Sequence, residues 1–184
     1  MMQLHAAASP DLAALHAAAT AAGLTVSSSA CWPQTDADRE VTPVAGFIES
    51  TFSPLVAEVA GRALSGRDRV QQPGTVIGIV LVTALGDVTS AIRVATAVDA
   101  GQRVLPLLFF QSVPNAVAGY LAARWHLTGP VACVSGTSAG LAAAALLIAD
   151  ADADEVLLVR ADLAVTGGGD RAAAILVTGQ AGRE

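Results

Sequence analysis

The chain has 184 residues, 53% of them hydrophobic and only 14% charged, so it can bury a sizeable core as a single domain over residues 1–184. Its net charge of −6, with no basic run, argues against nucleic-acid binding, because phosphate neutralisation requires basic patches. Charge or turn residues break the apolar runs before the ~18 residues of a membrane span, and no basic leader segment is present, so we expect a cytoplasmic protein without a membrane partner.

Helical and extended segments alternate along the chain. The run TVIGIVLVTA at 75–84 is apolar on both faces, which is typical of a central strand in a covered sheet. The alternation predicts a layered α/β fold with a mostly parallel, five-stranded sheet. We expect helices at 10–22, within 47–66 and at 88–101, 115–126 and 140–151, and extended segments at 24–32, 75–84, 104–110, 131–135, 155–161 and 172–179.

The motif GTSAG at 136–140 stands between a strand and a helix and fits the G-x-S-x-G pattern of a nucleophile elbow. A serine nucleophile needs a base, yet the three histidines, at positions 5, 16 and 126, all precede Ser138. In the hydrolase order the histidine follows the serine. We therefore expect the two glycines of the motif to serve a tight turn and a close helix–strand approach rather than nucleophilic chemistry.

Cysteine and histidine do not suggest another reactive centre. Cys31 and Cys133 fit no metal-ligand spacing, so we expect neither a metal site nor a disulfide. Cys133 lies inside an apolar strand with no cation near it in sequence, which favours a buried, unreactive thiol. His126 is expected at the end of a helix, and Asp87, Asp162 and Asp170 in turns or caps.

Several segments together resemble the N-terminal half of β-ketoacyl synthases of the thiolase fold. The segment SVPNAVAGYLAARWHLTGP at 112–130 is similar to the helix and Gly-Pro turn that precede the active cysteine in that family. The segments GTVIGIVLVTALGD, EVLLVRAD and RAAAILVTG resemble core strands of the same half. The resemblance covers about residues 45–180 and implies a thiolase-like domain with a five-stranded sheet.

Two departures from the family bear on function. Counted from Pro130, the family's cysteine falls at Ser138, or at Thr137 if a one-residue shortening lies earlier. The sequence also ends where the family's C-terminal half, which supplies two histidines, would begin. Claisen condensation needs a thiolate and donors for the developing negative charge, so the resemblance implies a chain without catalytic residues of its own and without a cofactor.

A synthase relative without its cysteine resembles the chain length factors of type II polyketide synthases, in the short form of aryl polyene and highly reducing systems. This implies a heterodimer with a full-length ketosynthase, or a dimer of such heterodimers. The complex would work transiently on the phosphopantetheine arm of an acyl carrier protein. The implied dimer strand is Val131, Ala132, Cys133, Val134 and Ser135. The implied tunnel residues, which would limit the length of the product, are Phe109, Phe110, Gln111, Pro114 and Asn115.

Other interpretations stay open at this point. Phe109 and Phe110 fit plain core or interface packing as well as they fit a tunnel wall. A stand-alone serine acyltransferase or hydrolase that uses Ser138 is the competing enzyme class. A homodimeric, non-catalytic structural protein of the same fold is the third.

Overall fold

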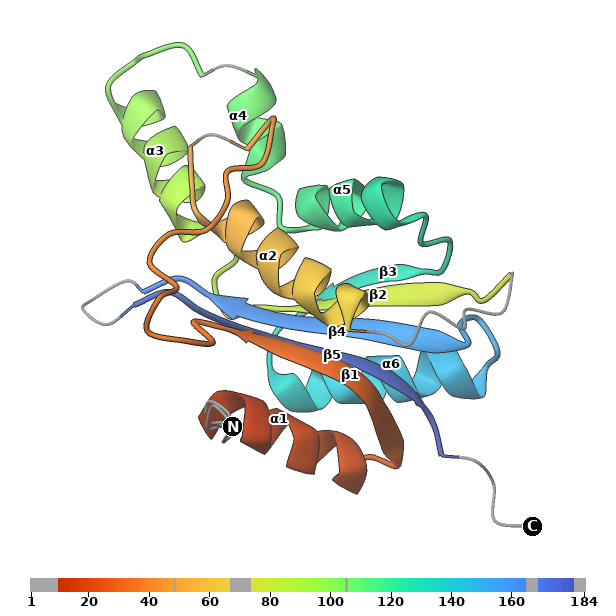
Figure 1. The fold of residues 1–184 in the computed structure, drawn as a ribbon. Helices are drawn as coiled ribbons and strands as arrows, with labels where there is room; N and C mark the ends of the chain where they lie inside the picture. Colours follow the sequence, from red (N-terminus) through yellow and green to blue (C-terminus); the bar gives the residue numbers. More distant parts are fainter. Residues whose placement is uncertain (1–9, 48, 67–73, 105, 165–168, 181–184) are drawn as a thin grey trace.

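A computed structural model of the chain describes residues 10–47, 49–66, 74–104, 106–164 and 169–180. Helices cover both faces of one central sheet (Figure 1). The helices are α1 (Pro10–Ala21), α2 (Phe52–Ser65), α3 (Val88–Asp99), α4 (Pro106–Gln111), α5 (Asn115–Trp125) and α6 (Thr137–Ala149). The strands are β1 (Leu24–Trp32), β2 (Ile77–Val82), β3 (Val131–Val134), β4 (Glu155–Asp162) and β5 (Arg171–Gly179).

The five strands lie in the order β1-β5-β4-β2-β3. β2 pairs in parallel with both β3 and β4, whereas β5 is antiparallel to both β4 and β1. The expectation of a mostly parallel sheet is therefore wrong in its pairing, because the sheet is mixed. The connection from Asp162 to Arg171 is too short for a crossover helix, so β5 returns beside β4 as a hairpin.

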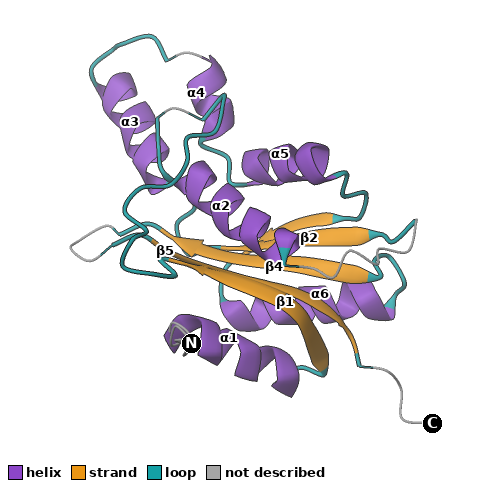
Figure 2. Ribbon diagram, in the orientation of Figure 1, coloured by secondary structure: helices purple, strands orange, loops and turns teal. Residues whose placement is uncertain are grey.

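The two faces of the sheet hold separate apolar clusters. On one face, α2 and α5 pack against the sheet, with Phe52, Leu55 and Leu121 almost wholly buried. On the other face, α1 and α6 pack side by side, with Leu15, Leu141 and the small residues around them (Figure 2). Every residue of β2 is buried and β2 is paired on both sides, which confirms the expected buried strand of a covered sheet, although β4 is the middle strand of the five.

The remaining helices differ from the covering layers. α3 begins after Asp87, whose carboxylate accepts a hydrogen bond from the Ser90 amide at 3.0 Å, as expected for a capping aspartate. The sequence pattern predicts an extended segment at 104–110, but α4 occupies Pro106–Gln111, so that prediction is wrong. A proline at the first helical position is compatible with a helix, and an apolar run this short has no periodicity that separates helix from strand.

Candidate functional site

The strand–turn–helix element around GTSAG is built as an elbow. β3 ends at Val134, and Gly136 follows with a φ of 90°, a conformation that glycine adopts without steric conflict. α6 begins directly afterwards at Thr137, three residues earlier than the sequence indicated. Thr137 and Ser138 therefore occupy the first turn of α6 rather than a loop.

Gly140 allows α6 to approach the sheet closely. A Cβ atom at Gly140 would lie 2.3 Å from Cγ2 of Val82 and 3.4 Å from Cδ1 of Leu158. The backbone of the helix thus rests directly on β2 and β4, and its first turn lies beyond the end of β3. The packing role expected for this glycine is the one the structure assigns to it.

Ser138 lies exposed on the first turn of α6. Within the described residues, neither Ser138 nor Thr137 has a side chain hydrogen bonded to its hydroxyl. His16 belongs to α1, and His126 caps α5 in a left-handed conformation with φ 54°, while His5 lies outside the described residues. A hydroxyl becomes a nucleophile only when a base takes its proton. Because no described base is hydrogen bonded to Ser138, the elbow does not activate this serine.

β3 forms one edge of the sheet. Among the described strands it pairs only with β2, and Val131 keeps 42% of its surface exposed. The carbonyls of Pro130 and Val134 accept hydrogen bonds from the β2 side, so the intervening residues Val131 and Cys133 direct their backbone groups to the free edge. An apolar strand with unpaired backbone groups is a template for another strand. The five residues 131–135 expected at an interface therefore lie on the open side of the sheet or at its end.

Cys133 is half-buried rather than buried, because its strand has a neighbour on one side only. Burial raises the pKa of its thiol. A raised pKa lowers the thiolate fraction at neutral pH, and the thiolate is the reactive form. Cys133 is thus less buried than expected, and its low reactivity stays a prediction.

The aromatic pair before α5 projects from the molecule. Phe109 and Phe110, both on α4, are 65% and 60% exposed, which excludes core packing within this chain. Gln111, next to them, is buried, and no described residue accepts a hydrogen bond from its Nε2. The structure keeps Phe109, Phe110 and Gln111 together on α4, and the turn that follows leads directly to Asn115.

Pro114 anchors the turn between α4 and α5. A Cβ atom on Gly86, which has a φ of 63°, would lie 2.6 Å from Cγ of Pro114. The turn after β2 and the start of α5 are thus in direct contact. Asn115 is exposed at the first position of α5, as the sequence indicated.

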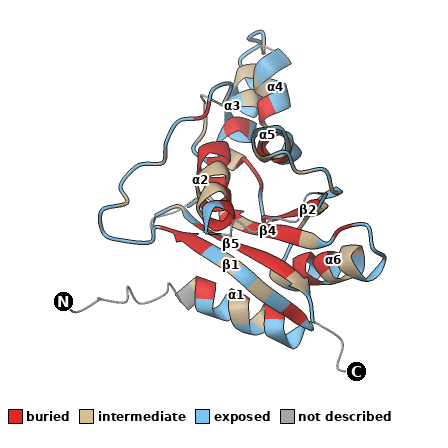
Figure 3. Cartoon of the chain, turned by 45° about the vertical axis from the view of Figure 1, so that its right-hand side comes forward, coloured by how far each residue is buried: buried red, intermediate tan, exposed pale blue. Residues whose placement is uncertain are grey.

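α3 and α4 together form a protruding unit, here called the apolar lobe (Figure 3). Of its members, the sequence pattern points only to the two phenylalanines. The others carry no such signal, because 104–110 resembles a strand and α3 resembles a helix that packs like its neighbours. The exposed large apolar residues of the lobe and its adjoining turns are Leu85, Ile92, Val98, Leu107, Phe109, Phe110 and Val113.

The described ranges contain neither a cluster of metal-ligating side chains nor a helix that could span a membrane. There, no three histidine, cysteine or carboxylate side chains gather closely enough to hold a metal ion. Nor does any helix in those ranges combine the length and apolar character that crossing a bilayer requires.

Comparison with solved structures shows which fold this is. A chain of the complex between a ketosynthase (ApeO) and its chain length factor (ApeC) from Xenorhabdus doucetiae superposes with a TM-score of 0.68 at 17% identity, covering 87% of this chain and 80% of that one. The ishigamide ketosynthase/chain length factor superposes with a TM-score of 0.63 at 20% identity, covering 80% of this chain and 49% of that one. The oxazolomycin ketosynthase domain from Streptomyces albus superposes with a TM-score of 0.55 at 12% identity, covering 85% of this chain and 47% of that one.

The chain therefore spans most of the first of these structures and about half the length of the other two. At these identities the likeness concerns the fold. No curated protein matches the sequence. Residues 49–167 match the model of the beta-ketoacyl synthase N-terminal domain, which is more than half of the chain. The chain belongs to the beta-ketoacyl synthase N-terminal domain family.

Proposed function

We propose that this chain is a non-catalytic chain length factor: a subunit that pairs with a ketosynthase and shapes the tunnel in which an acyl or polyketide chain grows on an acyl carrier protein. The observation that carries the proposal is made in the part of the chain that the structure describes: an elbow presents Ser138 without a bonded base, beside an apolar strand edge that no described strand covers. The family match and the likeness to ketosynthase and chain length factor structures support the same assignment.

The chemistry of condensation assigns the catalytic step to the partner. Carbon–carbon bond formation on a thioester needs an acyl-accepting nucleophile that is ionised near neutral pH, and a thiolate meets that need. Among the described residues, no base is hydrogen bonded to the hydroxyl of Ser138. Cys133 lies in the strand rather than on the elbow, and its pKa is raised. The ketosynthase partner would therefore supply the nucleophile.

The free edge of β3 supplies a physical basis for pairing. A partner strand would bond to the backbone groups of Val131 and Cys133 and would cover the exposed Val131 side chain. The apolar lobe would then provide large side chains close to the shared surface. Phe109 and Phe110 would set the length of the product by filling the end of the tunnel, since each ring occupies volume that a longer chain would need.

The decisive experiment is co-expression of the full chain with a cysteine-bearing ketosynthase encoded beside it. We expect a 1:1 complex by size-exclusion chromatography with light scattering. Val131→Pro removes only an amide that points to the free edge, so it should abolish the complex while circular dichroism stays native. Val131→Ala is the matched control and should keep the complex.

Other results would overturn the proposal. If the chain alone is monodisperse and hydrolyses acyl thioesters, and Ser138→Ala abolishes that activity, it is a serine acyltransferase or hydrolase. If Val131→Pro dissociates a homodimer and no ketosynthase binds, it is a homodimeric structural protein.

The tunnel assignment has its own test. Phe109→Ala and Phe110→Ala in the active complex should shift products to longer chains by mass spectrometry. Ile92→Ala removes a comparably exposed side chain from α3 and is the control. Unchanged product length in both phenylalanine variants would remove them from the tunnel while leaving the pairing proposal intact.

A further inference from the structure

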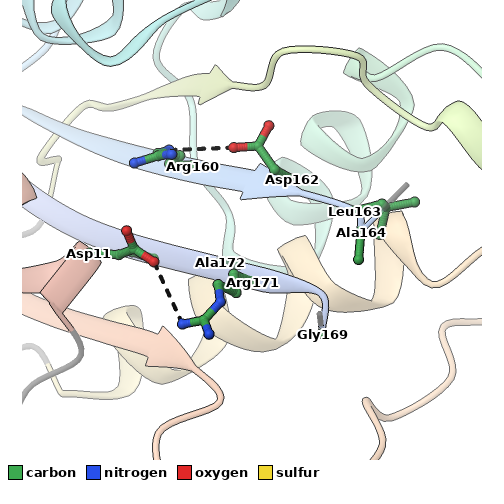
Figure 4. Close-up of a pocket in the computed structure, with 9 residues that line it drawn as sticks. Asp11, Arg160, Asp162, Leu163, Ala164, Gly169, Arg171 and Ala172 are labelled. Carbon is green, nitrogen blue, oxygen red and sulfur yellow. Dashed lines mark ion pairs between the residues drawn. The ribbon is translucent and has the colours of Figure 1, made fainter. Parts of the chain in front are cut away.

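A hollow of about 260 Å³ opens where β4 ends and β5 begins, next to the first turn of α1. Arg160 and Asp162 stand on β4 and Arg171 on β5, and Asp11 reaches in from α1 (Figure 4). The elbow, the β3 edge and the apolar lobe contribute none of the described residues around it. Those residues are Asp11, Arg160, Asp162, Leu163, Ala164, Gly169, Arg171, Ala172 and Ala173.

The register of the two strands creates the hollow. Asp162 lies directly opposite Arg171, and Arg160 lies directly opposite Ala173, so all four side chains share one face of the sheet. Ala173 is the small member of the set, and its methyl group leaves the space beside Arg160 open. Two guanidinium groups on adjacent strands therefore border the same space.

Neither arginine of the hollow is fully engaged. The Arg160 Nε atom lies 3.4 Å from the Asp162 carboxylate, and an Arg171 nitrogen lies 3.9 Å from Asp11. Both distances exceed the roughly 2.8 Å of a charged hydrogen bond. Each guanidinium has five N–H donors, and among the described residues neither donates a hydrogen bond.

Arg62 shows what a fully engaged arginine looks like in this chain. It contacts Asp38 at 2.9 and 3.0 Å and Glu58 at 2.9 Å, and its guanidinium lies over the Trp32 ring. Arg62 belongs to the packed structure. By contrast, Arg160 interrupts an otherwise apolar, buried stretch of β4 without such partners.

The carboxylates of the hollow are partly committed elsewhere. Asp162 accepts a hydrogen bond from the Ala84 amide at 3.0 Å. Asp11 lies in the first turn of α1, where the helix dipole favours negative charge. An incoming anion would thus meet two arginines with free donors and two carboxylates whose charge is already partly offset.

We propose that this hollow binds the phosphate group of a small soluble phosphate ester. Arg160 and Arg171 bind the phosphate oxygens, since the planar guanidinium matches phosphate geometry. Ala164 and Ala173, which also line the hollow, contact a short organic group on the ester. The hollow is far wider than a phosphate group alone needs. This inference does not rest on the proposed function, because it uses none of the residues of the elbow, the edge or the lobe.

Isothermal titration calorimetry on the full chain, in the assembly in which it is purified, tests the site with butyl phosphate and inorganic phosphate. We expect saturable binding, tighter for butyl phosphate. The double variant R160Q/R171Q should weaken it about tenfold or more, as expected for loss of hydrogen bonds between charged groups. Arg93 is an exposed arginine of α3, so R93Q is the matched control and should bind butyl phosphate as the parent does.

A third variant, D11N, should change the affinity for butyl phosphate in the opposite direction. D11N removes the carboxylate that competes for Arg171, so butyl phosphate should bind several-fold tighter to it. A gain in D11N together with a loss in R160Q/R171Q supports the site.

Three results would overturn it: no saturable binding by the parent, equal binding by R160Q/R171Q and the parent, or tighter binding of butyrate than of butyl phosphate. Capture by phosphatidic acid vesicles without binding of butyl phosphate would assign the arginines to a lipid headgroup instead and would also overturn it.

Discussion

The α2 face of the sheet and the apolar lobe are made of similar residues in opposite surroundings. Phe52 on α2 is wholly buried, whereas Phe109 on α4 is 65% exposed. Arg62 of α2 has two carboxylate partners and an aromatic ring, while the lobe exposes aliphatic and aromatic side chains to solvent. Side-chain hydrophobicity alone thus does not separate the buried core of this chain from its exposed apolar surface.

The largest expected effect compares the two phenylalanines directly. Phe52→Ala should lower the free energy of unfolding by about 3–5 kcal/mol, because it leaves a cavity among fully packed side chains. Phe109→Ala should change it by no more than about 0.5 kcal/mol, as for other exposed positions. Urea unfolding of both variants measures the difference, and similar losses would show that the lobe is part of the core.

The next effect tests the helix on the opposite face. Gly140→Ala should lower the free energy of unfolding by about 1–3 kcal/mol, because its methyl group would overlap Val82. A methyl group at Gly119 on α5 would meet no neighbouring atom within 4 Å, so Gly119 is the matched control. Gly119→Ala should be neutral or stabilise by up to about 1 kcal/mol, since alanine favours helix. Thermal and urea unfolding measure the stability of both variants. An unchanged free energy of unfolding in Gly140→Ala would mean that α6 can shift outward.

A smaller effect on stability is expected at Asp38, the partner of Arg62. It tests how much this fully hydrogen-bonded arginine contributes, in contrast to the exposed apolar lobe. Hydrogen bonds from Arg62, then from the Gln34 amide, hold the pKa of Asp38 well below its usual range. Because the folded pKa is lower than the unfolded one, the stabilisation is complete above about pH 4 and is lost as acid protonates the folded carboxylate.

Asp38→Asn should therefore lower the melting temperature modestly at pH 7, with the difference from the parent shrinking below pH 4. Asp36→Asn, an exposed neighbour in the same turn, is the control and should be silent. A difference that persists unchanged at pH 2 would show that the Asp38–Arg62 pair does not act through its charge.

The smallest expected effect is on the rate at which Cys133, at the open edge of β3, is alkylated. Burial raises the pKa of Cys133, so iodoacetamide should alkylate it more slowly at pH 8 than it alkylates a free cysteine, and the rate should still rise above that pH. Mass spectrometry of the chain with and without a bound ketosynthase measures it. Pairing at β3 predicts further protection, and equal rates in the two states would place the partner elsewhere.

Several features of the fold follow from local sequence pattern alone. The uninterrupted apolar run at 75–84 predicts a central strand, and all of β2 is buried. The face of α2 that carries Leu55, Val59 and Leu64 is predicted from its spacing and is buried as expected. Such predictions succeed because a local pattern of apolar residues reports which face must avoid water.

Other features depend on neighbours distant in sequence. The direction of β5 follows from a short hairpin, and α4 is helical where it contacts α3 and α5. The exposure of Phe109 and the open edge beside Cys133 depend on what the sheet leaves uncovered. The hollow at Arg160 exists because strand register places Ala173 opposite it.

The amino-acid sequence by itself determined most of the elements, a buried interior strand and the strand–turn–helix elbow that carries Ser138, because each follows from local spacing and residue type. Only the tertiary structure decided which apolar side chains stay exposed and which edge of β3 no described strand covers. Those properties belong to the order of strands and the faces of helices, where residues far apart in the chain meet or fail to meet.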